Sequence, residues 1–384
     1  MELGLARIQS VACAAGLDAP SFPIIAVAGT NGKGSTVAYI SAILRTAGFR
    51  TGVYTSPHFI DFNERIVVDE QQISNDELCD AFACIESQRA DTALTYFEFT
   101  TLVAIYQFEA RAVDVAIMEV GLGGRLDAVN AWDSEVACVT SVGVDHVDWL
   151  GDNRESIGYE KAGIARAGKW LVCGDTDVPQ SVVEHSNDIG AKLLLIEDDF
   201  RLLSAADSQL YQGPCGELSR LPKSAIPAGW ATRNASVAIC ACTCFLGQLP
   251  AHHAVATALQ TVEIPGRLQQ VQYRDRLVLL DVAHNREAAA ELRDYLGRHP
   301  IEGHNRAVFA CMQDKDAAAV LAEVSGQITQ WFLPQLDYPR AKSAEELEAL
   351  INAREQPEND AESGPECSIS VSYTHLTLPT ICSV

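Results

Sequence analysis

A glycine-rich segment near the N-terminus carries the residue types that bind phosphate groups. Residues 28–35 read Ala-Gly-Thr-Asn-Gly-Lys-Gly-Ser and lie between a strand pattern and a helix pattern. Glycines let backbone N–H groups surround an anion without clashes from Cβ atoms, and a helix N-terminus adds partial positive charge. Lys33 would reach the outer phosphates of a nucleotide, and a nearby hydroxyl can hold Mg²⁺. We therefore predict a phosphate-binding loop, although Val27 and Gly34 depart from the strict Walker A pattern.

A second glycine-rich segment resembles a dinucleotide-binding fingerprint but does not complete it. Residues 121–126 read Gly-Leu-Gly-Gly-Arg-Leu, and Leu126 stands where the fingerprint needs Gly or Ala. The mismatch argues against NAD binding. We expect the glycines to let this loop pass close to another ligand.

Two residues that can bind a metal stand at the carboxyl ends of predicted strands. Glu119 lies at the end of the apolar run 114–120, and His146 follows the run 136–142. In a parallel sheet both ends face the ligand side, where a carboxylate can hold Mg²⁺. Taken alone, Glu119 fits a solvated strand-end acid equally well, and His146 fits a structural or solvated role equally well. Lys161 lies in a predicted helix, and its context predicts only a solvated lysine.

Three polar residues gather after a predicted strand in the C-terminal third of the chain. Asp281, His284 and Asn285 lie at or just after the end of the run 277–282. Such a cluster indicates a ligand site that faces a cleft. Asn285 also fits a simpler role as the cap of the following helix.

Short apolar runs alternate with helix patterns through the N-terminal half of the chain. One helix pattern covers residues 35–47 and ends at Gly48. Near-continuous apolar strands separated by helices are typical of a parallel sheet that is covered on both faces. The strands predicted here are 24–28, 51–55, 114–120, 136–142, 170–173 and 193–196.

A second, smaller α/β pattern follows a Pro-Gly break at residues 264–266. Its predicted strands and helices, in chain order, are 277–282, 286–296, 307–312, 317–324 and 328–333. Because Pro and Gly interrupt regular elements, the break predicts one domain over residues 1–264 and a smaller α/β domain over residues 265–371.

The charge balance excludes several classes of partner. The 384 residues include 28 Lys and Arg against 51 Asp and Glu, a net charge of −23. So acidic a protein repels nucleic acids and anionic membranes, and a phosphate ligand must bind through local amides, a few cations or a metal.

No apolar run approaches the roughly 20 residues of a membrane span, and the N-terminus lacks the order of a signal peptide. The 12 cysteines form no paired motif, which favours reduced, buried thiols in a cytoplasmic protein.

Seven segments, taken in order, resemble one family. Together they look like bacterial dihydrofolate synthase/folylpolyglutamate synthase, of the Mur ligase superfamily, over about residues 3–350. The segments are AGTNGKGS (28–35), TSPH (55–58), LTYFEFTT (94–101), MEVGLGGRLDAVN (118–130), SVGVDHVDWLGDNRESIGYEKAGI (141–164), PGR (265–267) and DVAHN (281–285).

The resemblance implies both a fold and a reaction. The fold would be a P-loop-type, mostly parallel sheet domain with an added small sheet, followed by a smaller α/β, dinucleotide-fold-like domain that binds glutamate. The reaction would move the γ-phosphoryl group of ATP to the carboxylate of dihydropteroate or a folate. The amine of L-glutamate would then attack the acyl phosphate, which yields an amide, ADP and phosphate. The resemblance also implies Mg²⁺ at two sites and a monomer.

The same resemblance assigns roles to individual residues. Nucleotide contacts are implied at Gly29, Thr30, Asn31, Gly32, Lys33, Gly34, Ser35, Asn234, Arg267 and Asp281. Mg²⁺ ligands are implied at Ser56, Glu119, His146 and Lys161, the last as a carbamylated lysine. Pterin contacts are implied at Thr95, Phe97 and Asp127, and His284 would lie near the incoming glutamate. The implied catalytic set is Lys33, Lys161 and His284.

Both ends of the chain depart from the family pattern. Members begin some tens of residues earlier and continue with a further strand and helix, whereas residues 372–384 read SYTHLTLPTICSV. We therefore expect truncation at both ends, an incomplete C-terminal domain and a non-native tail over residues 372–384. Two alternatives stay open: another Mur-type ligase that adds amino acids to a cell-wall nucleotide precursor, and a catalytically impaired nucleotide-binding fragment.

Overall fold

The computed structural model describes residues 4–274, 276–301, 303–353 and 366–370. The chain divides into two compact units, Met1–Val262 and Glu263–Val384, and each has its own buried core. Among the described residues, no helix is long and apolar enough to cross a membrane. Residues 372–384 lie outside the described residues, so the expectation of a non-native tail stays a prediction.

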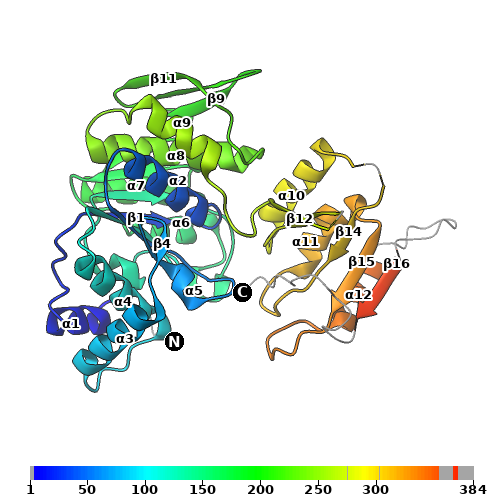
Figure 1. The fold of residues 1–384 in the computed structure, drawn as a ribbon, viewed down its shortest axis with the longest axis horizontal. Coiled ribbons are helices and arrows are strands. Elements are labelled where there is room, and N and C mark those ends of the chain that lie inside the picture. Colours follow the sequence, from blue (N-terminus) through cyan, green and yellow to red (C-terminus); the bar gives the residue numbers. More distant parts are fainter. Residues whose placement is uncertain (1–3, 275, 302, 354–365, 371–384) are drawn as a thin grey trace. The chain divides into compact units, whose positions relative to one another are not determined.

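An eight-stranded sheet forms the centre of the first unit (Figure 1). Six strands run parallel in the order β2-β5-β1-β6-β7-β8, and β3 and β4 continue the β2 edge in antiparallel fashion. The predicted mostly parallel sheet is therefore confirmed. The strands are β1 (Ile24–Ala28), β2 (Thr51–Tyr54), β3 (Ile66–Val68), β4 (Gln71–Gln72), β5 (Val115–Glu119), β6 (Val136–Val139), β7 (Trp170–Cys173) and β8 (Lys192–Leu195).

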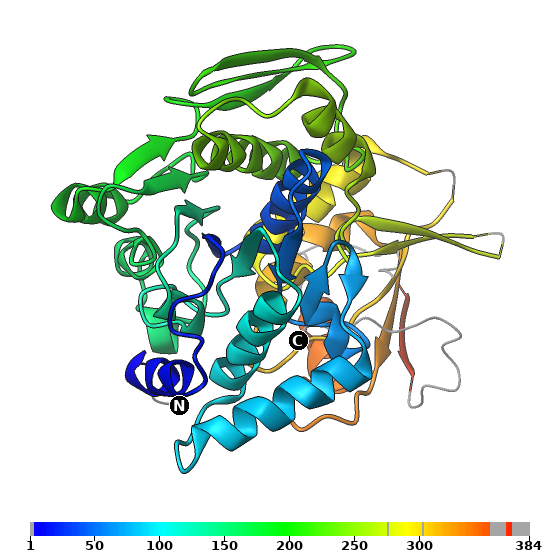
Figure 2. The same ribbon diagram turned by 60° about the vertical axis from the view of Figure 1, so that its left-hand side comes forward.

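Helices cover both faces of this sheet, which explains why its central strands are apolar along their whole length (Figures 1 and 2). Every residue of β1, β5 and β6 is buried. Ala26 joins the core that includes α1, α3, α4, α6 and α7, whereas Val27 points to the opposite face because strand side chains alternate. The helices of the first face are α1 (Ala6–Ala14), α3 (Asn75–Arg89), α4 (Tyr96–Ala110), α6 (Arg154–Ala162) and α7 (Gln180–Ile189).

On the second face, α2 (Lys33–Thr46) packs against α8 (Gly229–Leu246) and α9 (His252–Thr261). A three-stranded antiparallel sheet, in the order β11-β10-β9, lies next to α8 and α9 (Figure 1). Its strands are β9 (Arg201–Ser204), β10 (Gln209–Gly213) and β11 (Gly216–Leu221). The residue patterns predicted no strands here; only the family resemblance implied the added small sheet.

The second unit combines a hairpin with a small parallel sheet. β12 (Gln269–Tyr273) pairs antiparallel with β13 (Arg276–Leu280), and β14, β15 and β16 pair in parallel. The strand predicted at residues 277–282 is therefore present, but its partner β12 was not predicted. The remaining elements are α10 (Arg286–Arg298), β14 (Arg306–Val308), α11 (Ala317–Val324), β15 (Gln330–Pro334), α12 (Ala344–Asn352) and β16 (Glu366–Ser370).

Candidate active site

The predicted phosphate loop joins the end of β1 to the start of α2. Gly32 is the N-cap of α2 and has φ +90°, a conformation that favours glycine. A Cβ atom on Gly32 would lie 2.6 Å from the side-chain oxygen of Asn234, and one on Gly29 would lie 1.9 Å from Thr140 Oγ1. Both glycines are therefore needed where the loop turns, and the N-terminal turn of α2 supplies the N–H groups of an anion site.

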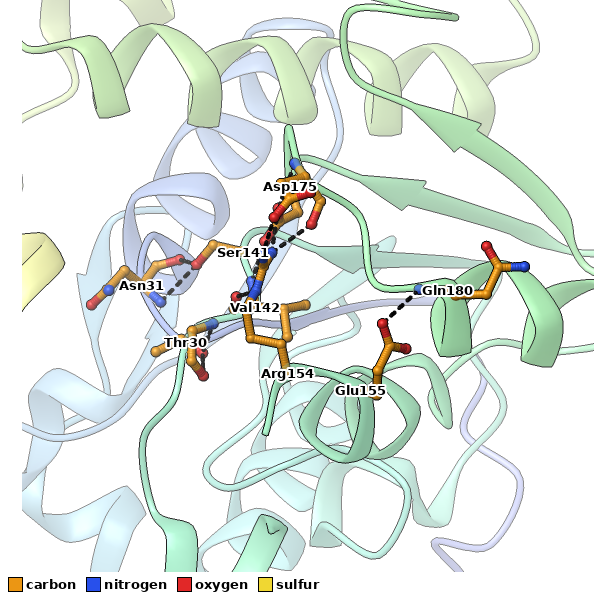
Figure 3. Close-up of polar contacts among 10 residues, drawn as sticks. Thr30, Asn31, Ser141, Val142, Arg154, Glu155, Asp175 and Gln180 are labelled. Carbon is orange, nitrogen blue, oxygen red and sulfur yellow. Dashed lines mark hydrogen bonds and ion pairs between the residues drawn. The ribbon is translucent and has the colours of Figure 1, made fainter. Parts of the chain in front are cut away.

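The loop that follows β6 holds the phosphate loop in place (Figure 3). The N–H of Thr30 donates to the carbonyl of Ser141 at 2.9 Å, and its hydroxyl donates to the carbonyl of Gly143 at 3.0 Å. The N–H of Asn31 donates to Ser141 Oγ, also at 3.0 Å. These bonds fix the phosphate loop to the segment that carries His146.

Lys33 and Ser35 turn back toward the phosphate loop. Lys33 Nζ donates to the carbonyl of Gly29 at 2.9 Å. Ser35 Oγ donates to the carbonyl of Gly32 at 2.9 Å and accepts from Asn234 Nδ2 at 2.6 Å. The ammonium group thus lies over the loop, where a bound phosphate would need a counter-charge, and α8 contacts the same loop through Asn234.

Glu119 lies beside the phosphate loop at the carboxyl edge of the sheet. It is 5 % exposed, and its Oε2 accepts from the N–H of Ser56 at 3.3 Å. A Cβ atom on Gly34 would lie 3.7 Å from the same oxygen. The alternative of a solvated strand-end acid is therefore wrong: a buried carboxylate lies beside the backbone of Ser56, and carboxylate oxygens are ligands that suit Mg²⁺.

His146 is at the same edge but is exposed. It precedes the short helix α5 (Val147–Leu150) and has φ +53°. Its Nε2 lies 3.8 Å from Asp145 Oδ2. In the part of the chain that the structure describes, no three His, Cys, Asp or Glu side chains form a metal-binding group, so a cation here would also need serine, phosphate or water oxygens.

Lys161 is buried, so the expectation of a solvated helix lysine is wrong. It is 3 % exposed, because it lies on the buried face of α6 together with Ile157, Gly158 and Ala162. Burial, reinforced by the charge of Lys33, lowers the pKa of Lys161 to about 7, although Asp145 and Asp127 oppose the shift. At neutral pH a large fraction of this amine is therefore uncharged and able to act as a nucleophile.

The predicted pterin residues lie on and around α4. Thr95 caps α4, since its hydroxyl accepts from the N–H of Glu98 at 3.2 Å, and it lines a surface hollow of about 490 Å³. The ring of Phe97 packs so closely on Gly121 that a Cβ atom there would lie 2.6 Å from it. Its centroid is 5.7 Å from that of Tyr54. The close approach explains why the loop needs glycine beside Phe97.

Asp127 is buried and bonded to the backbone of its own loop. Its Oδ2 accepts from the N–H of Leu122 at 2.9 Å, and its Oδ1 accepts from the N–H of Val129 at 3.0 Å. Burial raises the pKa of Asp127 to about 7, while these backbone donors and Lys33 act in the opposite direction. The carboxyl group therefore fixes the shape of the loop that follows β5.

In the second unit, the predicted residues cluster where β13 ends. Asp281 accepts from the N–H groups of Leu268 at 2.9 Å and Ala283 at 2.8 Å. Burial raises the pKa of Asp281, and Arg267 opposes the shift. His284 Nδ1 lies 3.0 Å from the carbonyl of Val282.

Asn285 caps α10, because its side-chain oxygen accepts from the N–H of Ala288 at 2.9 Å. The helix-cap interpretation is therefore confirmed for Asn285.

Comparison with known proteins places the chain in a family. The Mur ligase middle domain matches residues 27–194, and the glutamate ligase domain of Mur ligases matches residues 266–369. The dihydrofolate synthase/folylpolyglutamate synthase of Escherichia coli is 38 % identical over 347 residues, which are 90 % of this chain and 81 % of the relative. The chain belongs to the dihydrofolate synthase/folylpolyglutamate synthase family. It is therefore an ATP-dependent ligase of the Mur type.

Solved structures of the dihydrofolate synthase/folylpolyglutamate synthase family have the same fold. E. coli FolC in complex with DHPP and ADP has a TM-score of 0.89 and 35 % identity, covering 98 % of this chain and 86 % of that one. A bifunctional synthase with Mn, AMPPNP and L-glutamate bound has a TM-score of 0.86 and 39 % identity, covering 100 % and 92 %. The predicted fold class is therefore confirmed.

Sequence reasoning missed the residues that brace the His146 segment (Figure 3). Arg154 Nε donates to the carbonyl of Val142 at 2.8 Å, and its Nη2 donates to Asp175 Oδ1 at 3.0 Å. Asp175 Oδ2 accepts from the N–H of Val142 at 2.6 Å. Asp175 follows β7, so the strand-end rule that selected Glu119 could have found it. No local pattern identifies Arg154, whose partners are 12 to 23 residues away.

Proposed function

We propose that this chain joins L-glutamate to dihydropteroate, to the γ-carboxyl group of folylglutamates, or to both, through an acyl phosphate. The main support is the composition of one sheet edge in the first unit. There a phosphate loop, the buried Glu119 beside Ser56 and the buried amine of Lys161 surround the same region. The relatives solved with ADP, DHPP or L-glutamate agree with this assignment.

The reaction needs this arrangement for electrostatic reasons. A carboxylate is a poor electrophile, and transfer of the γ-phosphoryl group converts it into an acyl phosphate with a good leaving group. Bringing an anionic acceptor to ATP creates repulsion, which Lys33 and a divalent cation would screen. The amine of L-glutamate then forms the amide, and phosphate leaves.

We assign the divalent cation to Mg²⁺ and propose two sites. Ser56 and Glu119 would hold one ion, and Glu119, His146 and a modified Lys161 would hold the other. The uncharged amine of Lys161 can attack CO₂, which gives a carbamate and releases one proton. The pKa of about 7 supports this modification, because a lysine of ordinary pKa would be protonated. A carbamate would supply the oxygen ligands that Mg²⁺ prefers.

The remaining assignments divide between the two units. Asn234 would contact the nucleotide together with the phosphate loop, and Thr95, Phe97 and Asp127 would hold the pterin end of the acceptor. In the second unit, Arg267 and Asp281 would contact the nucleotide and His284 the incoming glutamate. We further propose a cytoplasmic monomer without nucleic acid or membrane partners, in keeping with the net charge of −23.

Phosphate release tests the proposal directly. The protein is incubated with ATP and Mg²⁺, with or without L-glutamate, and with either dihydropteroate or a tetrahydrofolate as acceptor. Phosphate that appears only when acceptor and glutamate are both present supports the proposal. ATP binding without glutamate-dependent ADP release would indicate an impaired fragment. Turnover with a UDP-linked cell-wall precursor would indicate a different Mur-type ligase.

A further inference from the structure

Arg65 is a buried cation without an ionic partner among the described residues. Its side chain belongs to the short helix η1 (Phe62–Arg65), and the residue is only 7 % exposed. Its Nε donates to His58 Nδ1 at 2.8 Å. Within the part of the chain that the structure describes, its terminal nitrogens make no hydrogen bond and no ion pair. Its terminal nitrogens are not among the fully enclosed polar atoms that lack a partner, so they are accessible from outside although the residue is mostly buried. Because arginines in such positions are normally paired, this one suggests a binding partner that is not part of the chain.

The surroundings of Arg65 hold its guanidinium in one orientation. The group lies 5.6 Å from the ring centroid of Phe62 and 5.5 Å from that of Tyr96. The adjacent carboxylate, Glu64, already accepts from the N–H groups of Phe59, Ile60 and Asp61. Phe62, Tyr96 and His58 thus hold the planar guanidinium group in position. Glu64, the acid closest in sequence, is already bonded to backbone N–H groups.

Arg65 lies on the side of the site assigned to the acceptor. The N–H of Thr55 donates to its carbonyl at 3.0 Å, so it stands directly opposite the segment that carries Ser56 and His58. Its charge acts on the hydroxyl of Tyr54, and so does the charge of Asp127. Tyr54 also contacts Phe97. The terminal nitrogens of the Arg65 guanidinium group therefore lie in the region where the acceptor would bind.

We propose that Arg65 binds the α-carboxylate of the terminal glutamate of a folylglutamate acceptor. This proposal rests on the proposed function and names a determinant of acceptor choice. Dihydropteroate has a single carboxylate, which must react, whereas a folylglutamate has the reacting γ-carboxylate and a second one that does not. An arginine fork binds a carboxylate through two parallel hydrogen bonds. Arg65 therefore favours glutamylated acceptors over dihydropteroate.

Steady-state kinetics of Arg65→Gln tests the proposal. The KM for a tetrahydrofolate monoglutamate should rise about tenfold or more, the effect of losing a charge-assisted hydrogen bond. The KM for dihydropteroate should stay within about threefold, and the KM for ATP should not change. Arg65→Lys should restore part of the loss, because it keeps the charge but not the fork. Arg50→Gln is the matched control, since Arg50 is exposed and faces Asp69.

Other outcomes would overturn the proposal. Equal losses with both acceptors would assign Arg65 to the reacting carboxylate or to the fold. A rise confined to the KM for L-glutamate would assign it to the incoming amino acid. Unchanged kinetics would remove any role in binding.

A binding experiment separates this proposal from the proposed function, because it needs no turnover. Wild-type protein should bind a folate monoglutamate about tenfold more tightly than its α-carboxamide derivative, and Arg65→Gln should bind the two equally. His58→Ala should keep part of the preference, since the charge stays but its orientation is released. Equal affinities in the wild type would refute the α-carboxylate assignment. Thermal melting of each variant checks that it folds.

Discussion

The phosphate loop and the segment from Asp281 to Asn285 have the same connectivity, but the N-termini of the helices that follow them are capped differently. Each follows a strand and leads into a helix, α2 or α10. In the first, Gly32 caps α2 without a side chain, and the positive charges of Lys33 and Lys161 act on each other. In the second, Asn285 caps α10, and Arg267 acts on the carboxyl group of Asp281. A helix N-terminus is available to an anion when no side chain of the protein caps it.

The largest effect should come from removing the ammonium group of Lys33 from the phosphate loop. Lys33→Ala should reduce turnover at least about a thousandfold, because Lys33 screens charge on the transferred phosphoryl group. The measurement is kcat with saturating substrates, and circular dichroism should show an unchanged fold. Lys169→Ala is the control, since Lys169 is a surface residue paired with Glu135. Turnover within about tenfold of the wild type, roughly 1.4 kcal/mol, would refute the phosphate-loop assignment.

A substitution at Gly32 tests the difference between the two helix N-termini, because it places a side chain at the N-cap of α2, where the loop has none. Gly32→Ala should weaken nucleotide binding about tenfold or more, because the new Cβ atom would clash with Asn234. It should also lower the free energy of unfolding by about 1–2 kcal/mol, since its φ is +90°.

Gly48→Ala is the matched control for Gly32→Ala. Its φ is +94°, but nothing lies within 4 Å of the position that a Cβ atom would take, so the backbone strain is similar and the contact is absent. Calorimetric titration with a non-hydrolysable ATP analogue compares the two variants. Equal loss of affinity in both would show that strain, rather than the clash with Asn234, governs binding.

The burial of Lys161, reinforced by its repulsion from Lys33, should appear as a pH dependence of stability. Unfolded Lys161 holds its proton up to about pH 10.5, whereas the folded residue releases it near its pKa of about 7. Between these values the unfolded state binds more protons, so the free energy of unfolding should rise with pH. Chemical unfolding of metal-free protein in CO₂-free buffer measures this slope, and Lys161→Met should flatten it. An unchanged slope in that variant would mean that Lys161 titrates normally in the folded state.

The smallest effect should come from a substitution in the segment from Asp281 to Asn285. Asn285→Ala should lower the free energy of unfolding by about 1 kcal/mol through the lost helix cap, and the affinity for ATP should not change. Ser343→Ala removes the cap of α12 in the same unit and is the matched control. If Asn285→Ala alone also raised the KM for L-glutamate, the segment would have a binding role beyond its helix cap.

The sequence predicts the first unit's sheet well because its signals are local. A buried parallel strand is apolar along its length, and the strand-end rule then locates Glu119 without knowledge of the fold. Lys161 could not be predicted in this way, because its burial depends on how α6 packs in the folded unit. Arg65 has no sequence signal either, since its contacts with His58, Phe62 and Tyr96 depend on how the folded chain brings these residues together.

Two weaker regions show the limit of pattern reasoning. The strands β9, β11 and β12 alternate irregularly and carry many exposed residues, so neither a period of two nor an apolar run identifies them. The small sheet could be inferred only from the family resemblance.

The hydrogen bond from Asn234 to Ser35 has a consequence for how the molecule assembles. The two residues are 199 positions apart in sequence, so the phosphate loop obtains this contact only after α8 has docked on α2. Contacts of such large sequence separation form late, since a long loop must close before they are gained. A fragment that stops at residue 194 would contain every residue of the glycine-rich motif and still lack Asn234. Nucleotide binding should therefore report on completed folding of the whole first unit.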